Sequence, residues 1–245
     1  MNRATHWLAF VASLWTMPCG AVALPITAFS SATGTQLPAP WRIVTLPKIP
    51  RHTMYALAEA DGRSVLRAEA DRAYASAVHP VNADINATSV LRFRWRADRF
   101  PAGSDLRTKA GDDVAAKVCL LFDLPLERLR LVDRVLIEIG RRRFDPELPT
   151  ATLCYVWDRV LPAGTWLPNA YTDRVRLLVL RSAQAGEAGR WFEERRDVAA
   201  DFRRAFAGEA TDRLPPLIAL ALATDADNTG DVALAWYGDL SLAAE

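Results

Sequence analysis

The chain has 245 residues, with 30 Lys and Arg against 29 Asp and Glu, which gives a formal net charge of +1. This balance argues against a general nucleic-acid binder, because such proteins carry a basic surface. The length suits one large β domain or two small ones, and no run after the N-terminus is apolar for long enough to cross a bilayer.

The N-terminus reads as a secretory signal peptide over residues 1–23. Arg3 supplies the positive start, Trp7 to Trp15 form a short apolar core, and Ala21-Val22-Ala23 matches a small-x-small cleavage site. The bulky Trp7 and Trp15 leave an uncleaved anchor as the alternative. Since arginine far outnumbers lysine, the composition indicates a GC-rich bacterial source, and we expect a bacterial periplasmic or secreted protein without a membrane span after cleavage.

Beyond an extended segment over residues 24–40, short β-type runs follow one another to the end of the chain. Asp61-Gly62 marks a hairpin turn between two of them. In another run Leu91, Phe93 and Trp95 alternate with arginines, as in a strand with one buried face. The predicted strands cover residues 41–46, 54–59, 65–70, 90–95, 115–122, 152–157, 175–180, 216–224 and 232–239. This pattern predicts a mainly β fold over residues 41–245, a single β-sandwich of the jelly-roll or lectin-like kind.

We expect one or two peripheral helices beside this sandwich. Residues 126–139 carry an apolar stripe with a helical period, formed by Leu126, Leu129, Val132, Leu136 and Ile139. Gly140 can end this helix, which places Arg141 to Arg143 at the negative end of its dipole. A second helix begins near Asp197, a good N-cap, with Val198, Phe202 and Phe206 on one face and Gly208 after it.

Cys119 and Cys154 remain after cleavage of the predicted signal, and each lies in an apolar strand-like run. Two buried thiols are the simplest interpretation. A disulfide is the alternative if the two strands are neighbours, because exported proteins meet an oxidising environment. No nearby histidine or further cysteine completes a metal site around them.

The acidic loop over residues 225–231 is the most informative motif. Asp225, Asp227 and Thr229 take the first, third and fifth positions of a calcium loop, and Gly230 takes the sixth. Trp236 stands where the bidentate glutamate belongs, so a Ca²⁺ site would need carboxylates from elsewhere, for which Asp112 and Asp113 are the candidates. The alternatives are a turn whose side chains accept backbone N–H groups, and direct contact between this loop and a ligand.

Aromatic and charged residues elsewhere have two interpretations each. Trp191 with Arg195 or Arg196 suits stacking on a sugar, but a core tryptophan beside arginines paired with the neighbouring acids is the favoured interpretation. Asn169 and Tyr171 lie in the long loop 158–172, which suits a sugar platform or a lid on the core. We find no nucleophile elbow, zinc signature or phosphate-binding glycine loop, so carboxylate chemistry is the one enzyme class left open.

Several segments together resemble a bacterial family of exported proteins catalogued as a domain of unknown function, numbered three thousand and forty-seven. The resemblance implies a single-domain lectin-like β-sandwich and no established activity, and Cys119 and Cys154 are not part of its pattern. It also implies that the Asp112-Asp113 pair and the acidic loop form one site. The segments that carry it are Leu91 to Trp95, Lys109 to Asp113 with Phe122-Asp123, Leu153 to Trp157, Arg190-Trp191 with Glu194 to Val198, and Thr224 to Thr229 with Tyr237 to Asp239.

Three functions are compatible with these observations. The leading hypothesis is a non-catalytic binding module for a glycan or another polar component of the cell envelope. The candidate ligand-binding residues are Asp112, Asp113, Trp191, Arg195, Asp225, Asp227 and Asn228. The alternatives are a carboxylate-dependent polysaccharide hydrolase or lyase that uses the same aspartates, and a structural periplasmic protein without a small ligand.

Overall fold

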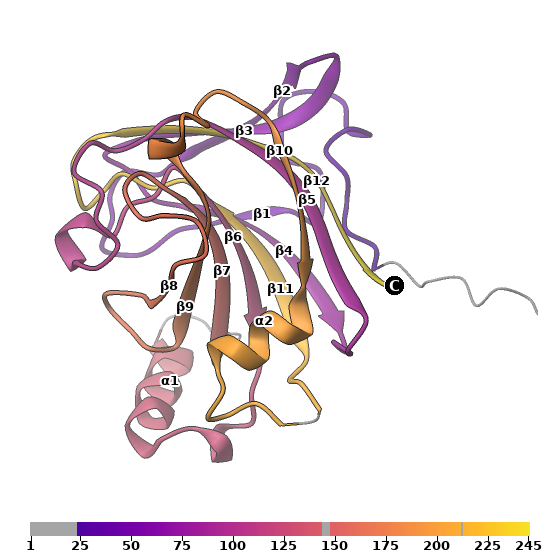
Figure 1. Ribbon diagram of the computed structural model, residues 1–245, viewed down its shortest axis with the longest axis vertical. Coiled ribbons are helices and arrows are strands. Elements are labelled where there is room, and N and C mark those ends of the chain that lie inside the picture. Colours follow the sequence, from indigo (N-terminus) through magenta and orange to yellow (C-terminus); the bar gives the residue numbers. More distant parts are fainter. Residues whose placement is uncertain (1–23, 144–147, 212) are drawn as a thin grey trace, which may run out of the picture.

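The computed structural model describes residues 24–143, 148–211 and 213–245, and two β-sheets pack face to face in it (Figure 1). The predicted signal peptide over residues 1–23 lies outside the described residues. The seven-stranded sheet has the order β1 (Arg42–Val44), β4 (Ser76–Ala83), β11 (Leu217–Ala223), β6 (Ala116–Phe122), β7 (Ala151–Asp158), β9 (Val175–Ser182) and β8 (Trp166–Pro168). The five-stranded sheet has the order β10 (Phe192–Asp197), β5 (Ser89–Arg99), β12 (Val232–Ala244), β3 (Arg63–Asp71) and β2 (Met54–Ala60). The prediction of a mainly β sandwich with peripheral helices is confirmed.

The inner faces of the sheets follow from the alternation in the sequence. Leu91, Phe93 and Trp95 on β5 are buried in the main core, whereas the arginines between them lie on the outer face. Trp95 meets Trp157 of β7 across the core, with 5.6 Å between ring centroids. Burial of such large aromatic surfaces between two sheets is the main source of stability in a sandwich.

The hairpin between β2 and β3 confirms the predicted turn. Asp61 and Gly62 both have positive φ, of 52° and 70°, as a two-residue turn of this kind requires. Three strands are missing from the sequence prediction: β4, β8 and β10. Of these, β10 reads Phe-Glu-Glu-Arg-Arg-Asp and forms a charged edge strand, a type that lacks the apolar alternation on which strand prediction depends.

The second predicted helix is confirmed as α2 (Val198–Ala205). The Asp197 side chain accepts a hydrogen bond from the backbone N–H of Ala200 at 2.8 Å, so it caps the helix as expected. Phe202 is fully buried and packs against Phe122 with ring centroids 4.7 Å apart. This contact fastens α2 over one end of the sandwich (Figure 1).

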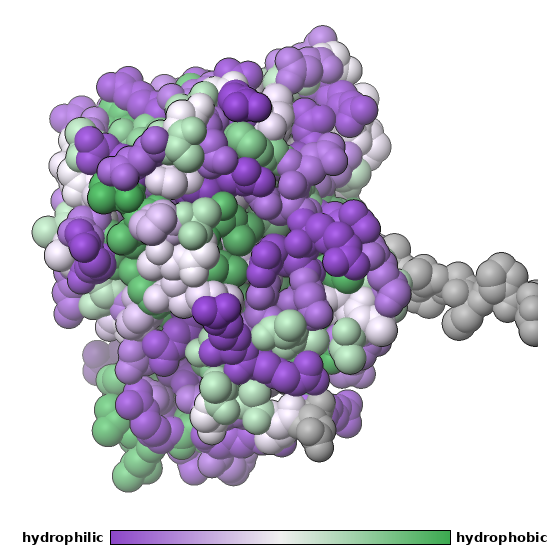
Figure 2. Space-filling model, in the orientation of Figure 1, coloured by the Kyte–Doolittle hydropathy of each residue, from purple (hydrophilic) through white to green (hydrophobic). Residues whose placement is uncertain are grey.

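The first helix differs from its prediction. It begins at Leu131 rather than 126 and runs through Gly140 to Arg143 as α1 (Leu131–Arg143). Gly140 does not end the helix, which continues to Arg143. A Cβ at position 140 would lie 2.7 Å from Leu148, so this glycine instead permits close packing. Within α1 the predicted stripe is exposed, at 62% for Leu136, whereas Ile137 on the other face is buried, as is Leu129 before the helix. Figure 2 shows apolar surface at the lower left, where α1 lies in Figure 1.

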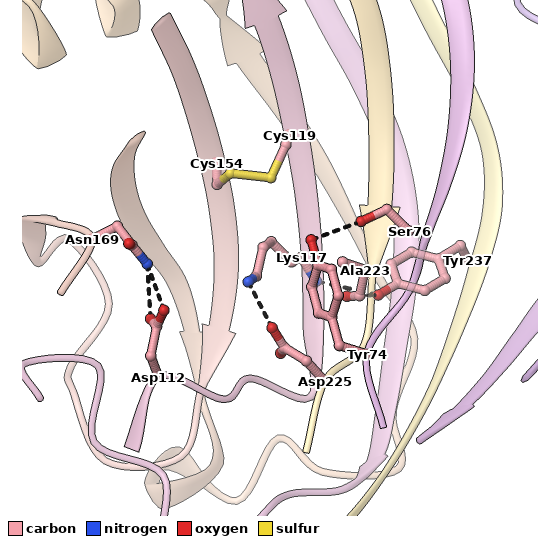
Figure 3. Close-up of a disulfide and its surroundings, with 10 residues drawn as sticks. All are labelled: Tyr74, Ser76, Asp112, Lys117, Cys119, Cys154, Asn169, Ala223, Asp225 and Tyr237. Atoms are coloured by element: carbon pink, nitrogen blue, oxygen red, sulfur yellow. Dashed lines mark hydrogen bonds and ion pairs between the residues drawn. A yellow bond between two sulfur atoms is a disulfide. The ribbon is translucent and has the colours of Figure 1, made fainter. Parts of the chain in front are cut away.

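No helix in the described ranges combines the length and apolar composition needed to cross a membrane. The outer face of the seven-stranded sheet carries a second apolar cluster, which includes Val156, Leu177 and Ala221. Within it, Cys119 on β6 lies directly opposite Cys154 on β7, and the two form a disulfide (Figure 3). Of the two alternatives left by the sequence, the structure therefore shows the disulfide.

Candidate functional site

The two acidic segments meet at one rim of the seven-stranded sheet. The Asp113 carboxylate is fully buried and accepts the backbone N–H groups of Asn228 (3.2 Å) and Thr229 (2.7 Å) as well as the Thr229 hydroxyl (2.6 Å). Asp225 in turn accepts the backbone N–H of Val114 at 2.7 Å. Each segment thus satisfies donors of the other, which fixes the acidic loop against the segment that precedes β6.

Asp225 forms a buried ion pair with Lys117, whose side chain extends from the outer face of β6 (Figure 3). The distance between Lys117 Nζ and Asp225 Oδ2 is 2.9 Å, and Asp225 is only 2% exposed. Burial raises the pKa of Asp225 to about 6, although the charge of Lys117 opposes the shift. Burial also acts to lower the pKa of Lys117, but the charges of Asp225 and Asp112 outweigh it and raise this pKa above its ordinary value. Both groups are therefore charged at neutral pH.

Asp112 lies on the other side of Lys117 and is held by Asn169 (Figure 3). The Asn169 amide nitrogen donates to both carboxylate oxygens, at 2.9 and 2.7 Å. Burial raises the pKa of Asp112, and the charge of Lys117 opposes that rise. The bond joins the loop between β8 and β9 to the acidic rim.

Tyr171 and Asn228 continue this rim toward solvent. Asn228 Nδ2 donates to the Tyr171 hydroxyl at 2.7 Å and to the Lys109 carbonyl at 2.8 Å. The Tyr171 hydroxyl also donates to the Lys109 carbonyl, at 3.1 Å, and the Tyr171 backbone N–H donates to Asn169 Oδ1 at 3.0 Å. Tyr171 nevertheless remains 55% exposed. The result is an exposed aromatic ring with a fixed orientation.

Asp227 is half-buried beside these groups. Burial raises its pKa, as does the charge of Asp113. Asp225, Asp227 and Thr229 were the predicted calcium ligands. In the structure Asp225 is paired with Lys117 and Thr229 donates to Asp113, so two of the three predicted ligand residues already have partners. Within the described residues no group of three or more His, Cys, Asp or Glu side chains is placed to hold a metal ion.

The structure places the other two candidates on a different surface. Trp191 precedes β10 and Arg195 lies on it, at the edge of the five-stranded sheet. Arg195 pairs with Glu245 at 2.8 Å, and the Arg94 guanidinium stacks over the Trp191 ring at 4.1 Å from its centroid. Trp191 and Arg195 were expected beside the acidic residues, but they contact Arg94 and Glu245 instead.

Lys117 is the central residue that the sequence reasoning missed. A signal was present, because the chain has only three lysines among its 30 basic residues and one of them lies inside an apolar strand. A lone lysine in such a run needs a buried carboxylate partner. Tyr237 was missed as well. It is buried beneath the rim, where its hydroxyl accepts from the Lys117 backbone N–H and donates to the Ala223 carbonyl at 2.6 Å.

Comparison with known proteins gives a family but no activity. A solved structure, the Spr0440 glycoside hydrolase domain, Endo-D from Streptococcus pneumoniae R6, matches with 11% identity and a TM-score of 0.33. The match covers 82% of this chain but only 21% of that one. No curated protein matches the sequence. A family model matches residues 39–241, and the chain therefore belongs to the family described as protein of unknown function (DUF3047).

Proposed function

We propose that the protein is an exported, non-catalytic module that binds a glycan at the rim formed by Asp112, Asn169, Tyr171, Asp227 and Asn228, here called the Tyr171 rim. The observation that carries the proposal is the exposed Tyr171 ring, held by hydrogen bonds through both its hydroxyl and its backbone N–H. An aromatic ring fixed in this way stacks on the C–H face of a sugar with little loss of conformational entropy.

The polar groups beside the ring suit sugar hydroxyls. Asp112 retains acceptor capacity after its bonds from Asn169, because an ionised carboxylate has about four lone-pair positions. The half-buried Asp227 carboxylate accepts the backbone N–H of its own residue but no side-chain hydrogen bond within the described residues, so it retains acceptor capacity for a ligand. Fixed acceptors next to an aromatic ring are the usual composition of a specific small-molecule site.

Burial of the other two aspartates favours binding over hydrolysis. Both oxygens of Asp225 are engaged, by Val114 N–H and by Lys117, and Asp113 accepts three hydrogen bonds while fully buried. A general acid or base must reach the proton that it transfers. These two carboxylates instead support the loops that present the Tyr171 rim.

Glycan binding is tested by isothermal titration of the protein lacking residues 1–23 with oligosaccharides selected on a glycan array. Tyr171→Ala should lower the affinity for the selected glycan by at least about tenfold, the scale of one stacking anchor. Met54→Ala is the matched control, because it also removes a large exposed side chain (65% exposed) but lies on β2. The proposal fails if no neutral glycan binds, or if both variants weaken binding equally.

Export is tested separately by expressing the full chain in a bacterium and fractionating the cells. We expect the protein in the periplasm or medium, with Leu24 as its first residue. The Cys119–Cys154 disulfide supports this proposal, since disulfides persist mainly in oxidising compartments. Retention of an intact N-terminus in the cytoplasm would contradict it.

A further inference from the structure

The outer face of the five-stranded sheet carries a hollow with a volume of about 420 Å³. It lies where the pairing of β5 with β12 is interrupted, between Tyr237 and Leu240. Three arginines line it, Arg92 and Arg94 from β5 and Arg195 from β10. The Tyr171 rim contributes no residue to this hollow.

Arg94 is held in a fixed position at this hollow. Its guanidinium lies over the Trp191 ring at 4.1 Å from the centroid, and its methylene stem crosses the backbone of Gly238. A Cβ at position 238 would come within 2.3 Å of Arg94 Cγ, so only glycine allows this approach. The three residues come from three of the segments that carry the family resemblance. A long flexible side chain is thereby preorganised between two rigid surfaces.

Arg94 has no anionic partner within the described part of the chain. It forms no ion pair or hydrogen bond through its guanidinium there, and its Nε is a buried donor without an acceptor, as is Nε1 of Trp191. An unpaired buried donor is costly, so one that persists in a native structure calls for an explanation. An anion that accepted a hydrogen bond from this guanidinium would remove the cost.

The nearby carboxylates are occupied elsewhere or exposed. Asp239 accepts the Ser30 backbone N–H at 3.0 Å together with its hydroxyl. Glu194 accepts from Trp95 Nε1 at 3.1 Å and pairs with Arg181 at 2.7 Å. Glu193 is exposed to solvent. None of them forms an ion pair with Arg94 within the described residues, although Glu193 lies directly opposite it on β10.

The two flanking arginines show which anion fits this surface. Arg92 and Arg195 both bind the side-chain carboxylate of Glu245, each at 2.8 Å. The planar guanidinium fork matches the planar carboxylate, and such pairs are stronger than neutral hydrogen bonds. Two of the three arginines that line the hollow thus already bind a carboxylate, and Arg94 binds none within the described residues.

We propose that Arg94, positioned by Trp191 and Gly238, binds the carboxylate of a sugar acid such as a uronic acid. The volume of the hollow lies within the range of small-molecule sites and suits a compact ligand rather than an extended chain. This site is separate from the Tyr171 rim and takes a charged ligand where the rim takes a neutral one.

Titration calorimetry with galacturonate at low ionic strength tests the proposal. Arg94→Gln should lower the affinity by at least about tenfold, the scale of a charge-assisted pair. The matched control is Arg96→Gln, on the same strand and face, because Arg96 already pairs with Asp98 at 2.6 Å. We expect this control to stay within about twofold of the wild type on the same scale.

A second variant gives a readout that a structural role for Arg94 would not produce. Glu245→Gln removes a competing carboxylate from Arg92 and Arg195, and so should raise the affinity for galacturonate several-fold. Arg94→Lys keeps the charge but loses the fork, and should bind more weakly than the wild type. Melting curves of each variant identify any that fail to fold.

Comparison of several ligands shows which chemical group the hollow binds. The methyl ester of galacturonate should not bind, because it keeps the ring and lacks the charge. The proposal is overturned if galacturonate does not bind, if its ester binds equally, or if Arg94→Gln and Arg96→Gln lose the same affinity. Preference for N-acetylalanine or inorganic sulfate over galacturonate would overturn it too, by assigning the hollow to peptide carboxylates or to tetrahedral anions.

Discussion

Replacement of Lys117 by methionine should destabilise the protein strongly at pH 8. The substitution removes the partner of Asp225, which is 2% exposed and would keep only the Val114 N–H as a hydrogen-bond donor. At 2.9 Å, the lost attraction is about 6 kcal/mol with an effective dielectric constant of about 20. Burial of the methionine side chain offsets part of this loss, so we expect a net cost of about 3–5 kcal/mol.

The same variant should regain stability as the pH falls. Burial already raises the pKa of Asp225 to about 6, from 3.8 for the free group. The folded state therefore binds the proton of the Asp225 carboxyl group more tightly than the unfolded state does. Protonation of Asp225 stabilises the fold fully below pH 3.8, and this stabilisation is lost as the pH rises through 6. Without Lys117 the pKa of Asp225 in the folded state rises further. The pH range over which the free energy of unfolding falls then extends toward neutral pH.

Urea unfolding at pH 8 and pH 5 measures both effects, with the double variant Lys117→Met, Asp225→Asn as the control. The introduced asparagine would keep an acceptor for the Val114 N–H without a charge, so the double variant should recover most of the lost stability and lose the added pH dependence. A cost of less than about 1 kcal/mol for Lys117→Met at pH 8, or a double variant as unstable as the single one, would refute this role of the ion pair.

Three further predictions concern the fold. Replacing Cys119 and Cys154 together by alanine should cost about 4 kcal/mol in urea unfolding, from the 35-residue separation that the disulfide closes; no change would exclude the disulfide in solution. Ile137→Ala should cost about 2–4 kcal/mol and Leu136→Ala less than about 1, because only the first is buried; the reverse order would show that α1 faces the other way. Asp197→Ala should lower the free energy of unfolding by about 1 kcal/mol through loss of its cap on α2, and an unchanged value would contradict that cap.

Local patterns predicted much of the fold. The alternation around Leu91, Phe93 and Trp95 identified both the strand and its buried face, and Asp61-Gly62 identified the hairpin. The stripe of α1 was misleading because its apolar residues do not face the sheet, where Ile137 is buried instead. Periodicity gives the relative phase of the side chains on a helix, but tertiary packing decides which face is covered.

The candidate site was only partly accessible to sequence reasoning. The resemblance joined Asp112 and Asp113 to the acidic loop, and the hydrogen bonds between these segments show that they are in contact. Lys117 was missed because its role depends on Asp225, which is 108 residues away along the chain. Trp191 was grouped with the aspartates, although its contact is with Arg94 on the other sheet. Such pairings are set by strand order, which local sequence does not encode.

The most direct test of the proposed function is the affinity of the Tyr171 rim for a neutral glycan, measured by titration calorimetry on the wild type, Tyr171→Ala and Met54→Ala. We expect binding by the wild type and by Met54→Ala, and a loss of at least about tenfold for Tyr171→Ala with a cooperative melting transition retained. Equal affinity of all three proteins, or no binding by the wild type to any glycan on the array, would contradict it.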